Sequence, residues 1–148
     1  MASKWNGKQC PICSEGILRD GKIKRQLEYR GRIYEFMTKG AFCDHCHDGF
    51  PEHDAREEAA WLVFRDRVDA EEIAELARIR KKLGLTQQQA AKLAGGGKNA
   101  FSRYERGQVK PVAAVTNLFR LLDRHPDLLR ELQAEITARL FGTMDCCV

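Results

Sequence analysis

The sequence predicts an α+β protein with a small β-rich, zinc-ribbon-like domain at residues 1–68 and an all-α domain of five helices at residues 69–148. Four of the six cysteines lie before residue 50, among segments whose apolar residues alternate as they do in strands. From Pro51 onward the apolar residues recur at helical spacing, and Gly and Pro separate the periodic segments. This change of period distinguishes the two parts.

A hairpin is expected between the cysteine pairs. Apolar residues alternate around 23–29 and again around 33–36, and Arg30-Gly31 stands between the two runs. A glycine-containing dipeptide at that place is typical of a tight turn, so the pattern predicts two antiparallel strands.

Capping residues predict where the first helices begin. Asp54 can cap a helix, and a second apolar repeat starts at Asp69. The sequence leaves open whether these two segments form one continuous helix. Thr86, followed three residues later by Gln89, has the capping-box pattern of a helix over 86–94.

Glycine and proline set the remaining boundaries. Gly84 ends the segment that starts at Asp69, and a run of three glycines follows the helix over 86–94. Three more helices are expected: one covers 98–106, one begins at Pro111, and one extends from Asp127 to about Phe141.

The cysteines of the first domain form two Cys-x-x-Cys pairs, Cys10 with Cys13 and Cys43 with Cys46. Two intervening residues let both thiolates of a pair point at one ion, and four thiolates suit tetrahedral zinc. We therefore expect one structural Zn²⁺ per chain, without an open coordination position for catalysis. The alternatives are a redox pair, an iron–sulfur centre, or His47 in place of one cysteine.

Other potential ligands are weaker candidates. A polar cluster could in principle bind a second metal, but these residues can equally belong to a hydrophilic loop. The cluster consists of Asp44, His45, His47, Asp48 and His53. Cys146 and Cys147 have no partner pair and are expected to be free thiols near the C-terminus.

Composition excludes several classes of protein. The chain has no apolar run long enough to cross a bilayer and no signal-peptide pattern, so we expect a cytoplasmic protein. A Ser/His/Asp arrangement, a phosphate-binding loop and an open metal site are all missing from the sequence, so we expect no enzymatic activity.

Positive charge is concentrated within the second domain. Residues 76–110 carry nine basic residues and one acidic residue, whereas the net charge of the whole chain is +4. Such an excess is typical of a polyanion-binding surface, although a solvated helix face can have the same composition. The expected helices over 86–94 and 98–106 fit a helix-turn-helix, the second being the recognition helix.

Asn99 and Arg103 are the predicted base-reading residues. They are four residues apart and share one face of the recognition helix. Asn can bind adenine and Arg can bind guanine through paired hydrogen bonds in the major groove. Lys98 and Ser102 are assigned to the DNA backbone. The alternative is that Asn99 only caps the helix and Arg103 is a surface charge.

Two segments, Gly84-Leu85-Thr86-Gln87 and Ser102-Arg103-Tyr104-Glu105-Arg106-Gly107, resemble the XRE/Cro-type helix-turn-helix family. The resemblance implies that Arg80 pairs with Glu105 and thereby locks the two helices together. It also implies that Gln87 contacts a DNA phosphate. The glycine run at 95–97 is a departure, because the turn of that family usually carries an apolar core residue.

The two halves together are similar to the MqsA-type antitoxins of bacterial toxin–antitoxin systems. The similarity rests on both cysteine pairs and on Gly-Gly-Gly-Lys-Asn-Ala-Phe-Ser-Arg-Tyr-Glu at 95–105, and it covers about residues 8–130. It implies a zinc-bearing half that neutralises a toxin, commonly an mRNA-cleaving ribonuclease. It also implies a C-terminal half that dimerises and represses its own operon, with Asn99 and Arg103 at base-reading positions. The alternative is a stand-alone zinc-containing regulator of phage origin.

Partner surfaces are expected in both halves. In the first half, an exposed strand edge around 22–36 could accept a strand of a partner protein, with Tyr29, Tyr34 and Phe36 as anchors. In the second half, a surplus of apolar residues predicts a homodimer that matches a palindromic operator. The alternative is that these residues fill the core of the monomer. The apolar residues in question are Val115, Leu118, Phe119, Leu122, Leu128, Leu129 and Leu132.

Overall fold

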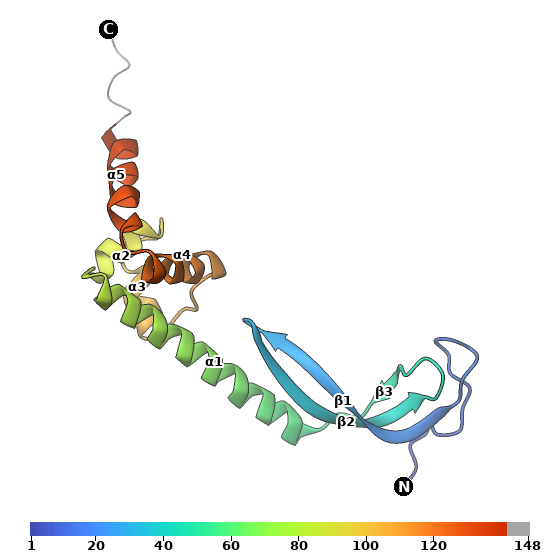
Figure 1. Ribbon diagram of the computed structural model, residues 1–148. Helices are drawn as coiled ribbons and strands as arrows, with labels where there is room; N and C mark the ends of the chain where they lie inside the picture. The colour runs from blue at the N-terminus through green and yellow to red at the C-terminus, as the bar shows by residue number, and fades with distance from the viewer. Residues whose placement is uncertain (142–148) are drawn as a thin grey trace. The chain divides into compact units, whose positions relative to one another are not determined.

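The computed structural model describes residues 1–141, so the two C-terminal cysteines, Cys146 and Cys147, lie outside the described residues. Within the described part, three antiparallel strands precede five helices, in the order β1-β2-β3-α1-α2-α3-α4-α5 (Figure 1). The predicted α+β class is confirmed. By its internal contacts the chain divides into two compact units, Met1–Val68 and Asp69 onward.

The first unit is built on a long hairpin. Strand β1 (Leu18–Tyr29) pairs with β2 (Arg32–Cys43) in antiparallel register, and Tyr29 lies opposite Arg32. Both turn residues have left-handed backbone, with φ of 49° at Arg30 and 74° at Gly31, as a two-residue hairpin turn requires. The predicted hairpin is confirmed, but its strands extend beyond the alternating residues.

The two faces of the hairpin differ in chemistry. Residues that lie directly opposite each other share a face, so Leu27 lies beside Tyr34 on one side. The other side is more polar, although the exposed Ile33 and Met37 lie on it. There Gln26 donates a hydrogen bond to Glu35 at 2.5 Å, and Lys24 pairs with Glu35 at 2.7 Å. The apolar side is the one that meets helix α1, because Trp61 contacts the ring of Tyr34.

A third strand, β3 (Gly49–Pro51), was missed by the sequence analysis. It pairs with the end of β2, with Phe42 opposite Gly49. A side chain at Gly49 would collide with the carbonyl oxygen of Ala41. Three residues are too few for a recognisable period, so only the pairing partner identifies this strand.

Helix α1 (Ala55–Lys82) is a single helix of 28 residues. It begins where predicted, because Asp54 Oδ1 accepts a hydrogen bond from the Arg56 N–H at 2.9 Å. The question of a break near Asp69 is settled in favour of continuity: no Gly or Pro interrupts the segment, and Val68 and Asp69 are both buried on it.

Helices α2 (Gln87–Leu93) and α3 (Ala100–Glu105) follow. The capping box of α2 is confirmed, since the Thr86 and Gln89 side chains each bond the other's backbone N–H, at 3.1 and 2.9 Å. Gly95 ends α2 in a Schellman motif with φ of 68°: its N–H bonds the Lys92 carbonyl, and the next N–H bonds the Ala91 carbonyl.

Two helix starts differ from the sequence prediction. Helix α3 begins at Ala100 rather than 98, because Lys98 and Asn99 form a turn that the Ala100 N–H closes on the Gly97 carbonyl. Helix α4 (Ala113–Arg124) begins after Val112, so Pro111 precedes the helix and is buried. The last helix, α5 (Leu128–Phe141), starts after the break at His125-Pro126 as expected.

The second unit has an apolar core drawn from four helices and the loops between them. Phe101 and Phe119 lie at its centre, fully buried, with ring centroids 4.8 Å apart. The other buried members are Leu76, Ile79, Leu85, Ala90, Ala91 and Val115. The core therefore holds α3, which carries the predicted base-reading face, against α1 and α4.

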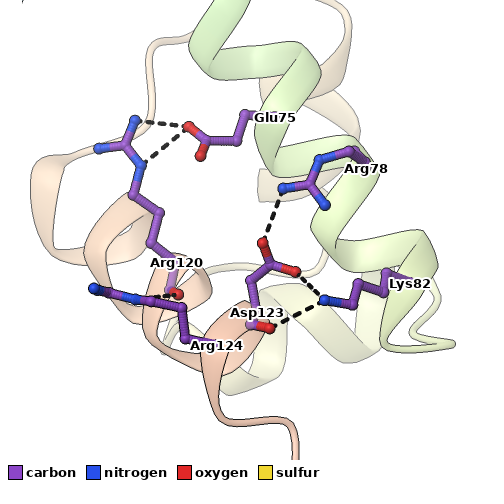
Figure 2. Close-up of polar contacts among 6 residues, drawn as sticks. All are labelled: Glu75, Arg78, Lys82, Arg120, Asp123 and Arg124. Atoms are coloured by element: carbon purple, nitrogen blue, oxygen red, sulfur yellow. Dashed lines mark hydrogen bonds and ion pairs between the residues drawn. The ribbon is translucent and has the colours of Figure 1, made fainter.

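Ion pairs join α1 to α4 at the surface of this core (Figure 2). Asp123 accepts from Arg78 at 2.9 Å and from Lys82 at 2.6 Å, and Arg120 donates to Glu75 at 2.7 Å. Together the hydrogen bonds from Arg78 and Lys82 hold the pKa of Asp123 at about 2. The carboxylate is therefore charged at neutral pH.

Candidate metal centre and nucleic-acid interface

The two cysteine pairs build the same turn twice. The Ser14 N–H donates to the Cys10 carbonyl at 2.9 Å, and the His47 N–H donates to the Cys43 carbonyl at 3.1 Å. The residue that follows each pair has left-handed backbone, with φ of 60° at Ser14 and 61° at His47. The sequence did not predict that Ser14 and His47 close these turns, although each residue directly follows a Cys-x-x-Cys pair.

The four thiols of these turns converge on one point. All four sulfurs lie within 4.8 Å of one another. Cys10 Sγ is 3.8 Å from Cys46 Sγ, and Cys13 Sγ is 3.7 Å from Cys43 Sγ. A tetrahedral ion with metal–sulfur bonds of about 2.3 Å requires sulfur separations of about 3.8 Å, so the set fits zinc. Four cysteines that could bind one metal ion are thus brought together.

Protonation of the thiols is uneven. Hydrogen bonds with the backbone of Gly16 and Glu15 lower the pKa of Cys13 to about 6. A backbone hydrogen bond at Asp48 lowers the pKa of Cys46, but burial and the neighbouring thiols outweigh it and raise that pKa to about 12. Binding of a metal to all four thiolates therefore releases protons, and the metal affinity decreases as the pH is lowered.

The surroundings of the sulfurs are tightly packed. A methyl group at Gly16 would collide with Cys43 Sγ, so only glycine fits beside this ligand. The His45 N–H donates to Cys43 Sγ at 3.3 Å. The His45 ring lies 3.1 Å from the Glu15 carboxylate. Among the described residues, these cysteines are the only group of three or more possible ligands that lie close enough to share an ion. His47 is not part of the group, and the polar loop residues form no second one.

A bidentate ion pair connects α1 to α3 in the second unit. Arg80 donates to Glu105 at 2.5 and 3.2 Å, and both side chains are largely buried, with 12% and 15% exposure. Arg80 also donates to the Leu85 carbonyl at 2.8 Å. Burial alone would raise the pKa of Glu105, but the hydrogen bonds from Arg80 and Gln87 outweigh it and hold that pKa below the usual value.

Gln87 lies in this same cluster. Its side-chain amide donates to Glu105 at 2.8 Å, and the residue is only half-buried. The resemblance to the XRE/Cro-type family implied a DNA phosphate contact for Gln87, and the contact with Glu105 was not predicted. The two residues are eighteen positions apart, so only the packing of α2 on α3 brings them together.

The predicted DNA-contacting residues lie together at the start of α3. Lys98, Asn99 and Arg103 are exposed, whereas Ser102 is half-buried. Asn99 stands at the N-cap position without a side-chain capping hydrogen bond, so its amide is not engaged by the helix end. Phe101 and Tyr104 turn the opposite way, and their rings are 5.6 Å apart.

Ion pairs reduce the positive charge that this region can offer to a ligand. Arg78, Arg80 and Lys82 are all bound to carboxylates of α3 or α4. Lys92, Lys98 and Arg103 make no ion pair with any residue that the structure describes. Lys110 pairs with Asp69 as well. The charge excess read from the sequence is therefore partly structural, and its unpaired part extends from Lys81 at the end of α1 to Arg106 after α3.

Comparison with known proteins identifies the family. Residues 8–133 match the family model described as the antitoxin component of the bacterial toxin–antitoxin system, MqsA. The chain is 37% identical over 130 residues to "Antitoxin MqsA" of Escherichia coli (strain K12), which covers 84% of this chain and 99% of that protein. The chain belongs to the MqsA antitoxin family.

The match to the MqsA family covers both candidate sites. It includes the four cysteines and every residue from α1 to α4, and it ends at residue 133, inside α5. The remainder of α5 therefore lies beyond the part that matches the family model. No helix in the described part of this MqsA-family chain combines the length and apolarity needed to cross a bilayer.

Proposed function

We propose that this chain neutralises a cognate toxin, an mRNA-cleaving ribonuclease, through residues 1–68, and represses its own operon through residues 69–148. Its setting is the cytoplasm, where both partners are found. The observation that carries the proposal is membership of the MqsA antitoxin family over nearly the whole chain. The two compact units supply separate surfaces for the two tasks.

In this proposal α2 and α3 form a helix-turn-helix, and α3 enters the major groove of double-stranded DNA. The exposed amide of Asn99 and the guanidinium of Arg103 read bases, while Lys98 and Ser102 contact the backbone. Gln87 contacts a phosphate and at the same time donates to Glu105. The Arg80–Glu105 pair keeps α3 at a fixed angle to α1.

DNA affinity measurements test the base-reading assignment. Arg103→Ala and Asn99→Ala should each cost about 1–3 kcal/mol on the operator with little effect on random DNA. Lys98→Ala should weaken both DNAs alike and reduce the salt slope by about one unit, because a phosphate contact carries no sequence information. Equal losses on both DNAs for Arg103→Ala would make Arg103 a backbone contact instead.

One Zn²⁺ held by Cys10, Cys13, Cys43 and Cys46 is the proposed cofactor. When bound, it cross-links the two ends of the hairpin and does no chemistry, because four thiolates leave no open position. The sulfur separations and the thiolate donor set support zinc over harder metals. Elemental analysis should give one zinc per chain, and an iron–sulfur absorption spectrum would contradict the assignment.

The toxin is proposed to bind the hairpin. Backbone groups of Leu18 and Asp20 bond to the N-terminal segment, which covers the start of β1. From Lys22 to Tyr29 the outer edge of β1 pairs with no other strand of the described chain. A partner strand can add to such an edge through main-chain hydrogen bonds.

A neighbouring gene provides the test for a toxin partner. The product of the gene beside this one should be captured by the full chain, and the bound complex should protect residues 22–36 from hydrogen exchange. Protection confined to residues beyond 69 would contradict the assignment. If no toxin gene lies beside this one, a stand-alone regulator explains the chain better.

A homodimer through the second unit is the last part of the proposal. Three of the seven residues expected at the interface are core residues instead, since Val115, Phe119 and Leu122 are buried within one chain. Leu129 packs against the same core, whereas Leu118, Leu128 and Leu132 line an apolar groove of about 320 Å³ between α4 and α5. Its apolar lining consists of Leu118, Leu121, Leu122, Leu128, Leu132 and Ile136.

Sedimentation of the full chain tests this interface. The wild type should sediment as a dimer at micromolar concentration, and Leu121→Glu should convert it to a monomer, because the Leu121 side chain is 42% exposed beside the groove. Val112→Glu is the control, since Val112 is 61% exposed just before α4 and does not line the groove. A wild type that is monomeric would contradict the proposal.

A further inference from the structure

A groove of about 300 Å³ lies on the apolar face of the hairpin, between β2 and the first turns of α1. All its walls belong to the first unit. Its floor is aromatic: the ring centroid of Tyr34 is 5.6 Å from that of Phe36 and 5.5 Å from that of Trp61. Leu27 also lines the groove and is 44% exposed. Apolar surface gathered in one open groove is typical of a binding site.

The rim of this groove is predominantly acidic. Four carboxylates line it, against the two cations Arg25 and Lys39: Glu52, Asp54, Glu57 and Glu58. The Arg25 guanidinium lies over the Phe42 ring, 5.8 Å from its centroid. The rim therefore has an excess of negative charge beside half-buried aromatic rings.

Two of these carboxylates already have structural roles. Asp54 caps α1, and Glu57 accepts a hydrogen bond from the Tyr34 hydroxyl at 2.6 Å. That bond raises the pKa of Tyr34 to about 12, so the hydroxyl stays protonated and keeps Glu57 in place. Glu57 thus holds the aromatic floor against the helix.

The other two carboxylates remain available. Glu52 is exposed, and its side chain bonds to no residue in the part of the chain that the structure describes. Glu58 has only a 3.7 Å contact with His53, and both side chains are largely exposed. Inside the groove, Thr38 Oγ1 is covered from solvent and has no hydrogen-bond partner among the described residues.

We infer that this groove receives an arginine side chain from the toxin, stacked on the Tyr34 and Trp61 rings and paired with Glu52 and Glu58. A guanidinium matches both parts of the site, because it is planar enough to stack on an aromatic face and pairs with carboxylates through two hydrogen bonds. A purely apolar anchor would gain nothing from the acidic rim.

The charge of the partner agrees with this occupant. The inference rests on the proposed function, in which the partner is a ribonuclease. A protein that holds RNA needs a positively charged surface for the phosphates, so basic side chains are available on it. An acidic groove on the antitoxin complements that surface and would repel an anionic ligand.

Calorimetric titration of the full chain with the neighbouring gene product tests the inference. The double variant Glu52→Lys/Glu58→Lys should weaken binding by about tenfold or more and flatten its salt dependence. The control is Asp66→Lys, which reverses an exposed charge on α1 outside both the groove and residues 22–36. It should bind like the wild type, and unchanged thermal unfolding and zinc content should accompany both variants.

The outcomes separate the inference from the proposed function. If the wild type does not bind the neighbouring gene product, both are wrong. If the wild type binds and the double variant binds equally well, only the arginine site is wrong. Weakening by Trp61→Leu without any effect of the double variant would show an apolar anchor and would also overturn the inference.

Discussion

The two units bury very different amounts of apolar surface. In the first unit, the central cluster of buried residues consists of Cys10, Leu18, Ala41 and Cys43, so two of its four members are thiols. In the second unit the corresponding cluster has eight members, all of them aliphatic or aromatic. A small region with little core needs a metal or another cross-link to fold, whereas the helical unit can rely on burial.

Removing one cysteine ligand should have the largest effect, because it should destabilise the first unit and leave the second unit folded. Cys43→Ser should unfold residues 8–50 and abolish zinc binding, because binding of structural zinc supplies about 10–16 kcal/mol in comparable sites. The NMR signals of the second unit should be unchanged. Ile12→Ser is the control, because Ile12 lies inside a cysteine pair, is 54% exposed and is not a ligand. A first unit that stays folded without zinc would contradict the contrast.

The complementary change removes the centre of the helical core. Phe119→Ala should cost about 3–5 kcal/mol of unfolding free energy, because a fully buried aromatic ring is replaced by a cavity. Zinc content should stay at one per chain. Asn117→Ala on the same helix should cost much less, since Asn117 is exposed. Chemical denaturation followed by a probe in each unit separates the two effects.

Breaking the buried ion pair should have a smaller effect on the second unit. Arg80→Ala should cost about 2–3 kcal/mol, because it leaves Glu105 buried without its partner. Lys81→Ala, one residue further along the exposed surface of α1, is the control. Thermal unfolding measures both, and a loss in DNA affinity without a loss in stability would contradict the structural role.

Acidification should remove the contribution of the Arg80–Glu105 ion pair to the stability of the second unit. The pKa of Glu105 is lower in the folded chain than in the unfolded one, so the ion pair stabilises the fold above the unfolded value and this stabilisation is lost as pH falls through the folded value. The difference in melting temperature between wild type and Arg80→Ala should therefore shrink below about pH 4. A difference that is constant over this range would contradict the assignment.

The surface pairs between α1 and α4 should contribute least. Asp123→Asn removes the partner of both Arg78 and Lys82, whose side chains are about half exposed (Figure 2). Its melting temperature should fall by less than that of Arg80→Ala, and added salt should remove the difference, because exposed pairs are screened. Lys92→Gln, on α2, is the control, because Lys92 is exposed and makes no ion pair with the described residues. An effect that persists in high salt would contradict this ranking.

The sequence by itself determined the features that depend on neighbouring residues. Arg30-Gly31 predicts the hairpin turn because that turn needs left-handed backbone at both positions. Thr86 with Gln89 predicts the capping box because the two side chains bond each other's backbone within one helical turn. The cysteine pairs belong to the same class, since each turn is closed within five residues.

Only the tertiary structure decided the contacts between distant segments. Strand β3 exists because Gly49 allows close approach to the backbone of Ala41, and no local period indicates it. Gln87 meets Glu105 because α2 packs on α3. Three cations of the basic segment are bound to carboxylates of α3 and α4, so the charge count overestimated the positive charge that is free to bind an anionic ligand. Such contacts depend on packing, which residue spacing does not specify.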